Sequence, residues 1–275
     1  MERRKRIKTD IVTVISILIL GIVILMAIAP QLFTHYDPLE VVMKDKLLEI
    51  SKEHWCGTDE FGRDIFARLV YGARNSILVG LGTAILSALV GVPLGLIAGF
   101  FGGIVDNIVM RLMDAFQSFP SMILAILLST VVTPSVGSLI LVISFVSFPR
   151  FARLTRGQVL TMKKQDYVAA AKIAGVNPGY LLFKSVLPNC MSVIIVQFSM
   201  LTATAILIEA SMSFIGLGIA APAPAWGSML YYANQYINSS ITYIIAPTLM
   251  IFLVVLSINM LGDTLRDWLD PKRKR

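Results

Sequence analysis

The sequence predicts an all-α integral membrane protein. Of its 275 residues, 56% are hydrophobic and 15% are charged, whereas about 25% of the residues in soluble domains are charged. The mean hydropathy of +0.76 points the same way. Several uncharged stretches also reach the length of about 20 apolar residues that a helix needs to cross a bilayer. These three observations exclude a soluble globular domain.

Six membrane-spanning helices are expected, with divisions where Gly and Pro interrupt the uncharged stretches. The first follows the basic start Arg3-Arg-Lys-Arg6 and resembles a signal peptide, but its length and Pro30 argue against cleavage. The fourth is short and either tilts or continues past Pro149. The expected spans are 11–30, 75–101, 115–132, 138–149, 191–218 and 241–261.

The Lys and Arg residues predict the orientation of the chain, because cytoplasmic loops of membrane proteins carry an excess of them. With both termini inside, 18 of the 24 Lys and Arg residues lie on the cytosolic side, in 1–10, 102–114, 150–189 and 262–275. We therefore expect three parts: a cytosolic tail, first span and outer loop (1–74), a core of five spans with a cytosolic loop at 150–189 (75–263), and a basic cytosolic tail (264–275).

Several classes of function are not supported by the residues present. The net charge of +7 comes from tails and one loop without interleaved aromatic residues, so we expect no nucleic-acid partner. His35 and His54 have no second ligand at metal-site spacing, and Cys56 and Cys190 are expected on opposite sides of the membrane. The chain also contains no Gly-x-x-x-x-Gly-Lys-Ser/Thr loop, so any ATP must be bound by a partner.

The basic loop at 150–189 contains the pattern of a helical hairpin. Gly175 stands where a first helix would end in the left-handed conformation that glycine adopts without steric cost. Asn177 and Pro178 suit the N-cap and first position of a second helix. We expect either an ordinary connecting hairpin or a docking site whose first helix is kept slim by three alanines, Ala169, Ala170 and Ala171.

This hairpin resembles the loop of permease subunits in binding-protein-dependent ABC importers. The match is Ala169-Ala170-Ala171-x-x-x-Gly175 followed by Ser185-Val186-Leu187-Pro188, where the family has Glu-Ala-Ala…Gly…Ile-x-Leu-Pro. Ala169 replaces the usual glutamate, so no salt bridge to a partner can form from that position. The resemblance implies that the loop is a coupling helix seated on a cytosolic ATPase, with contacts from Ala169, Ala170, Ala171, Gly175, Leu187 and Pro188.

Three further segments resemble the C-type permeases of dipeptide, oligopeptide and nickel importers. They are Gly57-Thr-Asp-Glu-Phe-Gly-Arg-Asp64 with its continuation to Ser76, Ile208 to Gly218, and Pro224 to Leu230. The resemblance implies a type I ABC importer permease architecture with six transmembrane helices and a cytosolic coupling-helix hairpin. It also implies a place in the prokaryotic cytoplasmic membrane, with N- and C-termini in the cytosol.

The function implied by the resemblance is a permease for di- and oligopeptides that is not itself an enzyme. The alternative is a permease for nickel or a metal chelate. The implied partners are a second homologous permease, two cytosolic ABC ATPases that bind ATP and Mg, an external substrate-binding protein and membrane lipid, with no cofactor in this chain. A different class, an ion-gradient-driven secondary transporter, would need charges in several spans, and Glu209 is the only charge between Lys184 and Asp263.

Two groups of charged residues are candidates for further roles. Glu209 lies about 30 Å along a helix from Pro188, so it either lines or gates the outer end of the path or packs against a neighbouring helix. Asp59, Arg63 and Asp64 either make a rigid, self-paired loop or contact the substrate-delivering protein. Arg111 and Asp114 are expected to pair on one face of the third span.

Overall fold

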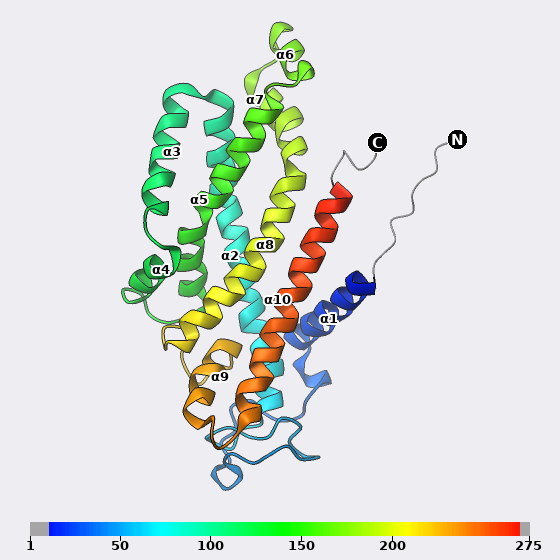
Figure 1. The fold of residues 1–275 in the computed structure, drawn as a ribbon, viewed down its shortest axis with the longest axis vertical. Coiled ribbons are helices and arrows are strands. Elements are labelled where there is room, and N and C mark those ends of the chain that lie inside the picture. The colour runs from blue at the N-terminus through cyan, green and yellow to red at the C-terminus, as the bar shows by residue number, and fades with distance from the viewer. Residues whose placement is uncertain (1–10, 270–275) are drawn as a thin grey trace, which may run out of the picture.

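The computed structural model describes residues 11–269, which form a bundle of long helices (Figure 1). The short connecting turns are η1 (Pro30–Leu32), η2 (Met43–Asp45), the π-helical turn η3 (Leu182–Val186) and η4 (Asn234–Tyr236). The helices are α1 (Ile11–Ile28), α2 (Ile65–Phe101), α3 (Gly103–Gln117), α4 (Ser121–Ser129), α5 (Val136–Met162), α6 (Asp166–Ile173), α7 (Pro178–Leu181), α8 (Leu187–Phe214), α9 (Trp226–Ala233) and α10 (Ile241–Leu269).

The all-α membrane class is confirmed, with one correction to the spans. Five helices are long and apolar enough to cross a membrane, and α3 with α4 gives a sixth crossing if that bent pair is one span. The continuous third span predicted at 115–132 is wrong, because α3 and α4 meet at 78°. Pro120 precedes α4 and cannot donate a backbone hydrogen bond, which explains the break. The segment 102–114, expected on the cytosolic side between the second and third spans, is mostly α3.

Several predicted boundaries are also wrong. Helix α2 begins at Ile65, where the Asp64 side chain caps it, so the boundary drawn between 74 and 75 falls inside α2. Helix α5 continues past Pro149 to Met162, so the loop predicted at 150–189 begins inside that helix. Helix α10 reaches Leu269. The tail 1–10 and the end of the tail 264–275 lie outside the described residues.

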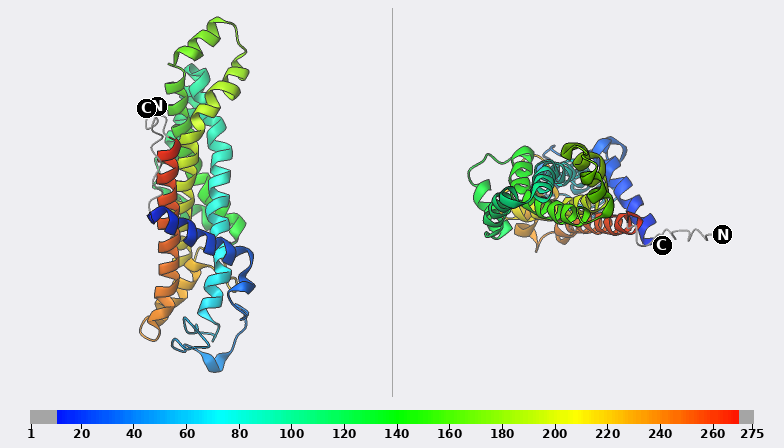
Figure 2. Two further views of the ribbon diagram at one scale, coloured as in Figure 1. Left: turned by 90° about the vertical axis from the view of Figure 1, so that its right-hand side faces the viewer. Right: turned by 90° about the horizontal axis from the view of Figure 1, so that it is seen from above.

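The ends of the helices lie at two opposite ends of the bundle. Thr13 near the start of α1 is 3.1 Å from Thr264 near the end of α10, measured between their hydroxyl oxygens. Lys163 after α5 donates to the carbonyl of Phe100 at the end of α2, at 2.7 Å. The α6–α7 hairpin projects beyond the bundle at this end, and the 31–64 loop lies at the other (Figure 1). Helix α1 crosses the bundle obliquely (Figure 2).

A stripe of glycines brings α2 and α5 into close contact. A Cβ added at Gly91 would lie 2.5 Å from the carbonyl oxygen of Phe148, and one at Gly95 would lie 2.3 Å from that of Ala152. At Gly99 an added Cβ would lie 2.8 Å from the Val159 side chain. Small residues at this spacing let helix backbones approach closely in membranes, where packing rather than the hydrophobic effect drives association. Helix α5 therefore packs closely along the C-terminal half of α2.

Candidate functional site

In the α6–α7 hairpin, the first helix ends and the second begins at the predicted residues. Gly175 has a φ of +73° and follows α6. The N–H of Val176 donates to the carbonyl of Ala171 at 3.1 Å, which closes the helix end. Asn177 caps α7 by accepting from the N–H of Gly179 at 2.8 Å, and Pro178 is the first helical residue. Both predicted caps are confirmed.

The hairpin is anchored in the helical bundle by apolar side chains. Val168 of α6 is fully buried, in one cluster with Leu181 and Leu182 from the second arm. The same cluster contains Phe151 of α5 and Cys190 of α8. The second arm also runs without a break through η3 into α8, where Leu187 and Pro188 form the first turn. The hairpin is therefore an extension of the bundle and not an independent loop.

The outer surface of the hairpin is apolar and uncovered. Ala169 and Ala170 are exposed. Ile173 is 89% exposed, and the aromatic side chains of Tyr180 and Phe183 are 60% and 61% exposed. These three larger side chains were not predicted as part of the site from the sequence, although bulky apolar residues in a basic loop indicate a surface for a partner. An apolar surface of this kind on a polar loop is typical of a docking site.

Ion pairs join α3 to α5 near the hairpin end. The guanidinium of Arg156 donates two bonds to the Asp106 carboxylate, one of them 2.6 Å long from Nη2. Arg153 Nη2 lies 2.6 Å from Asp114 Oδ1. The predicted pair of Arg111 with Asp114 is wrong, because Asp114 faces α5 instead. These contacts hold the broken third span against the bundle.

A groove of about 510 Å³ lies between α3, α5 and α8. We call it the α3–α5–α8 groove. Sequence reasoning missed it, because the side chains that line it come from three separate segments. They include Gln117 of α3, Arg150 and Arg153 of α5, and Gln197, Met200 and Thr204 of α8.

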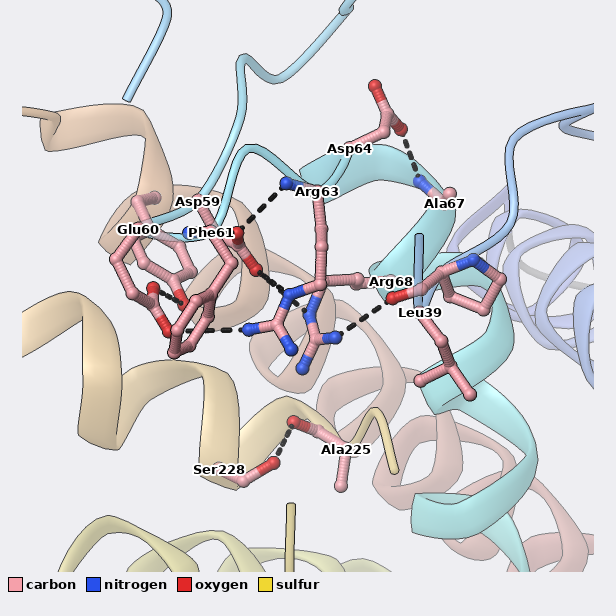
Figure 3. A network of polar contacts seen from close by, with 12 residues as sticks. Leu39, Asp59, Glu60, Phe61, Arg63, Asp64, Ala67, Arg68, Ala225 and Ser228 are labelled. Atoms are coloured by element: carbon pink, nitrogen blue, oxygen red, sulfur yellow. Dashed lines mark hydrogen bonds and ion pairs between the residues drawn. The ribbon is translucent and has the colours of Figure 1, made fainter. Parts of the chain in front are cut away.

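At the other end of the bundle, a buried network of charges holds the loop that precedes α2 (Figure 3). Asp59 Oδ2 lies 2.6 Å from Arg63 Nε and 3.4 Å from Arg68 Nε. Glu60 accepts from Arg63 Nη2 at 3.3 Å and from the Tyr243 hydroxyl of α10 at 2.8 Å. All of these side chains are buried, and their contacts tie the loop that precedes α2 to both α2 and α10.

Local turns complete this loop. Gly57 and Gly62 have φ values of +77° and +73°, as expected of turn glycines. Asp64 caps α2 through the N–H of Ala67 at 2.6 Å and also lies 2.9 Å from His54 Nδ1. Burial, with the Asp64 carboxylate nearby, raises the pKa of the Cys56 thiol. Within residues 11–269, no three His, Cys, Asp or Glu side chains are grouped as metal ligands.

This geometry favours the rigid-loop alternative for Asp59, Arg63 and Asp64. Their exposed fractions are 0%, 5% and 4%. Arg63 pairs with Asp59 as predicted, whereas Asp64 pairs with His54. A contact of these residues with an external protein stays a prediction.

Glu209 lies near the end of α8 and is fully buried within this chain. Its carboxylate accepts from the hydroxyl of Ser213 at 2.7 Å and from that of Ser76 on α2 at 3.5 Å. A buried carboxylate held by two serines satisfies the packing alternative. The other alternative, a role in the path, stays a prediction.

Several apolar helices long enough to span a bilayer, joined to an exposed helical hairpin, define a multi-pass membrane protein. Residues 91–275 match the family of binding-protein-dependent transport system inner membrane components. The chain belongs to this family and is a permease subunit of an ABC importer.

Individual relatives agree with this assignment. The chain is 41% identical to a dipeptide transport system permease protein of Alkalihalophilus pseudofirmus, over 99% of this chain and 90% of the relative. It is 37% identical to an oligopeptide transport system permease protein of Bacillus subtilis, over 98% and 88%. These two relatives are named DppC and OppC, so both are C-type permeases. The predicted resemblance to C-type permeases is therefore confirmed. A chain of the inward-facing MetNI methionine ABC transporter matches with a TM-score of 0.62 at 19% identity, over 74% of this chain and 96% of that one, which shows a shared fold.

The buried network around Glu60 can be tested through Tyr243. In Tyr243→Phe, the Glu60 carboxylate loses one donor in a site without water access, so we expect the free energy of unfolding to fall by about 1–3 kcal/mol. The measurement is the thermal unfolding of the purified protein in detergent. Tyr231→Phe is the matched control, because the Tyr231 side chain is 37% exposed. Equal melting temperatures for the two variants would contradict the role given to the network.

Proposed function

We propose that this chain forms one half of the membrane path of an importer for di- and oligopeptides. The relatives described above are named for dipeptide and oligopeptide transport, and they cover almost the whole chain. A nickel or metal-chelate cargo is not favoured by these relatives. The ion-gradient-driven alternative does not agree with membership of an ABC importer family.

The proposed assembly contains a second, homologous permease, two cytosolic ATPases that bind ATP and Mg, and an external substrate-binding protein. The hairpin supports the proposal of an ATPase partner. Its Ile173 side chain is 89% exposed, while the hairpin itself is anchored in the bundle core. In this proposal the hairpin end of the bundle is cytosolic, and both termini lie on that side of the membrane.

The proposed mechanism is alternating access. ATP-driven closure of the ATPases would move the docked hairpins of the two permeases together. Because the second arm of the hairpin continues into α8 and a short turn at 163–165 joins the first arm to α5, this movement would tilt those helices and open the path toward the outside. Hydrolysis on the ATPases would reverse the movement. Ala169, Ala170, Ala171 and Gly175 would form the close contact with the ATPase, while Leu187 and Pro188 would set the direction in which the hairpin joins α8.

Substitution of Gly175 tests the coupling role. A valine at a φ of +73° is strained, and no described atom beyond its chain neighbours lies within 4 Å of the added Cβ. We therefore expect Gly175→Val to insert normally but to hydrolyse ATP without uptake of peptide, measured in proteoliposomes containing the whole importer.

The matched control is Gly103→Val. Gly103 has a φ of +57° and equally open space around its Cβ, but it is the first residue of α3. This variant should keep uptake coupled to ATP hydrolysis. Normal transport by Gly175→Val, or equal uncoupling in both variants, would contradict a specific role for the hairpin.

We also propose that Glu209 lies at the outer end of the path. Glu209→Gln keeps a side chain of the same shape that can bond Ser76 and Ser213, and removes the negative charge. If the charge acts on the passing peptide, uptake by the whole importer should fall severalfold while the thermal stability of the protein is retained. Uptake at the normal rate and with normal specificity would leave Glu209 with a packing role only.

A further inference from the structure

The α3–α5–α8 groove lies deep within the bundle, as three helices show independently. At about 1.5 Å of rise per residue, Arg150 lies about 18 Å along α5 from its end at Met162. Gln197 lies about 15 Å along α8 from its start at Leu187, and Gln117 lies about 21 Å along α3 from Gly103. All three helix ends are at the hairpin end of the molecule. The groove therefore lies part-way along these helices, at a depth that a hydrocarbon layer about 30 Å thick would include.

At this depth the groove exposes polar groups that have no partners among residues 11–269. Arg150 is exposed and forms no ion pair or hydrogen bond with any described residue. The same is true of the amide groups of Gln117 and Gln197, among residues 11–269. Arginine at membrane depth faces a water-filled cavity or another polar surface and not lipid tails. These groups fit a water-filled or partner-covered groove better than a surface that faces lipid tails.

The charge of the groove is positive. Arg153 also lines it, but the carboxylate of Asp114 lies 2.6 Å from Arg153 and largely neutralises that charge. Arg150 has no such counter-ion, so one full positive charge is left. A planar guanidinium is well suited to bind a carboxylate through two parallel hydrogen bonds. The flanking amides of Gln117 and Gln197 can donate to and accept from peptide groups.

We propose that the α3–α5–α8 groove is a subsite of the path, in which Arg150 binds the C-terminal carboxylate of the transported peptide. This inference rests on the proposed function. The subsite recognises the free carboxylate and the amide backbone that all short peptides share. It does not discriminate between their side chains. Its partial exposure suits a transport site, since a ligand held too tightly would not leave.

The test uses the whole importer in vesicles of zwitterionic lipid, with and without added anionic lipid. ATP-driven uptake of trialanine is measured for Arg150→Gln, Arg150→Lys and the control Arg111→Gln. Arg111 is an exposed arginine of α3 that does not line the groove. We expect Arg150→Gln to lower uptake about tenfold, because the bond to a charged group is lost. Arg150→Lys should retain most of the uptake, and Arg111→Gln all of it.

A second measurement separates carboxylate binding from the selectivity of the binding protein. In the solubilised importer without that protein, a single cysteine is placed by Thr204→Cys, with Cys56 and Cys190 replaced by alanine. Trialanine should slow alkylation of this cysteine more than trialanine amide does. Arg150→Gln should remove the difference between the two peptides.

The outcomes distinguish the inference from the function on which it rests. If the unmodified importer takes up no peptide, the proposed function fails. If the unmodified importer takes up trialanine and Arg150→Gln takes it up at the same rate, the subsite is overturned. The subsite is also overturned if Arg150→Gln weakens protection by trialanine and its amide equally, if the effect on uptake appears only with anionic lipid, or if the variant no longer assembles with its partners.

Discussion

The close approach of α2 and α5 along Gly91, Gly95 and Gly99 is the contact on which the rest of the structure depends. A side chain at any of these positions would meet backbone or Cβ atoms of α5 within 2.8 Å. Helix α5 continues toward the hairpin, and the second arm of the hairpin continues into α8. The glycine contact therefore positions α5, which lines the groove and leads through the turn at 163–165 to the hairpin.

The opposite end of the bundle is held by a different kind of interaction. There, Asp59, Glu60, Arg63 and Arg68 form a buried network that reaches Tyr243 of α10. Buried charges are costly to leave unpaired, so such a network defines one arrangement of the loop more than it adds stability. With this end of the bundle held by the network and the hairpin end by apolar packing, a force on the hairpin is expected to tilt whole helices.

Much of this arrangement could be predicted from the sequence, because the bilayer demands long apolar helices and because caps use particular residues. Gly175 and Asn177 show this, as both take the predicted roles in the hairpin. The break before Ser121 was missed, since an uncharged stretch does not reveal a bend. The partners of Asp114 and Glu60 were also missed, because they come from distant segments that only tertiary packing brings together. For the same reason the groove around Arg150 could not be predicted.

The central claim is that the hairpin and α5 move as one body. It is tested most directly by the distance between spin labels at Ala174→Cys on the hairpin and Gly157→Cys on α5, two exposed positions, with Cys56 and Cys190 replaced by alanine. Pulsed electron spin resonance on the assembled importer would measure this distance without nucleotide and with ATP bound. The account predicts one narrow distribution that does not shift between the two states. A second or displaced distribution with ATP would show that the hairpin swings independently, and would contradict it.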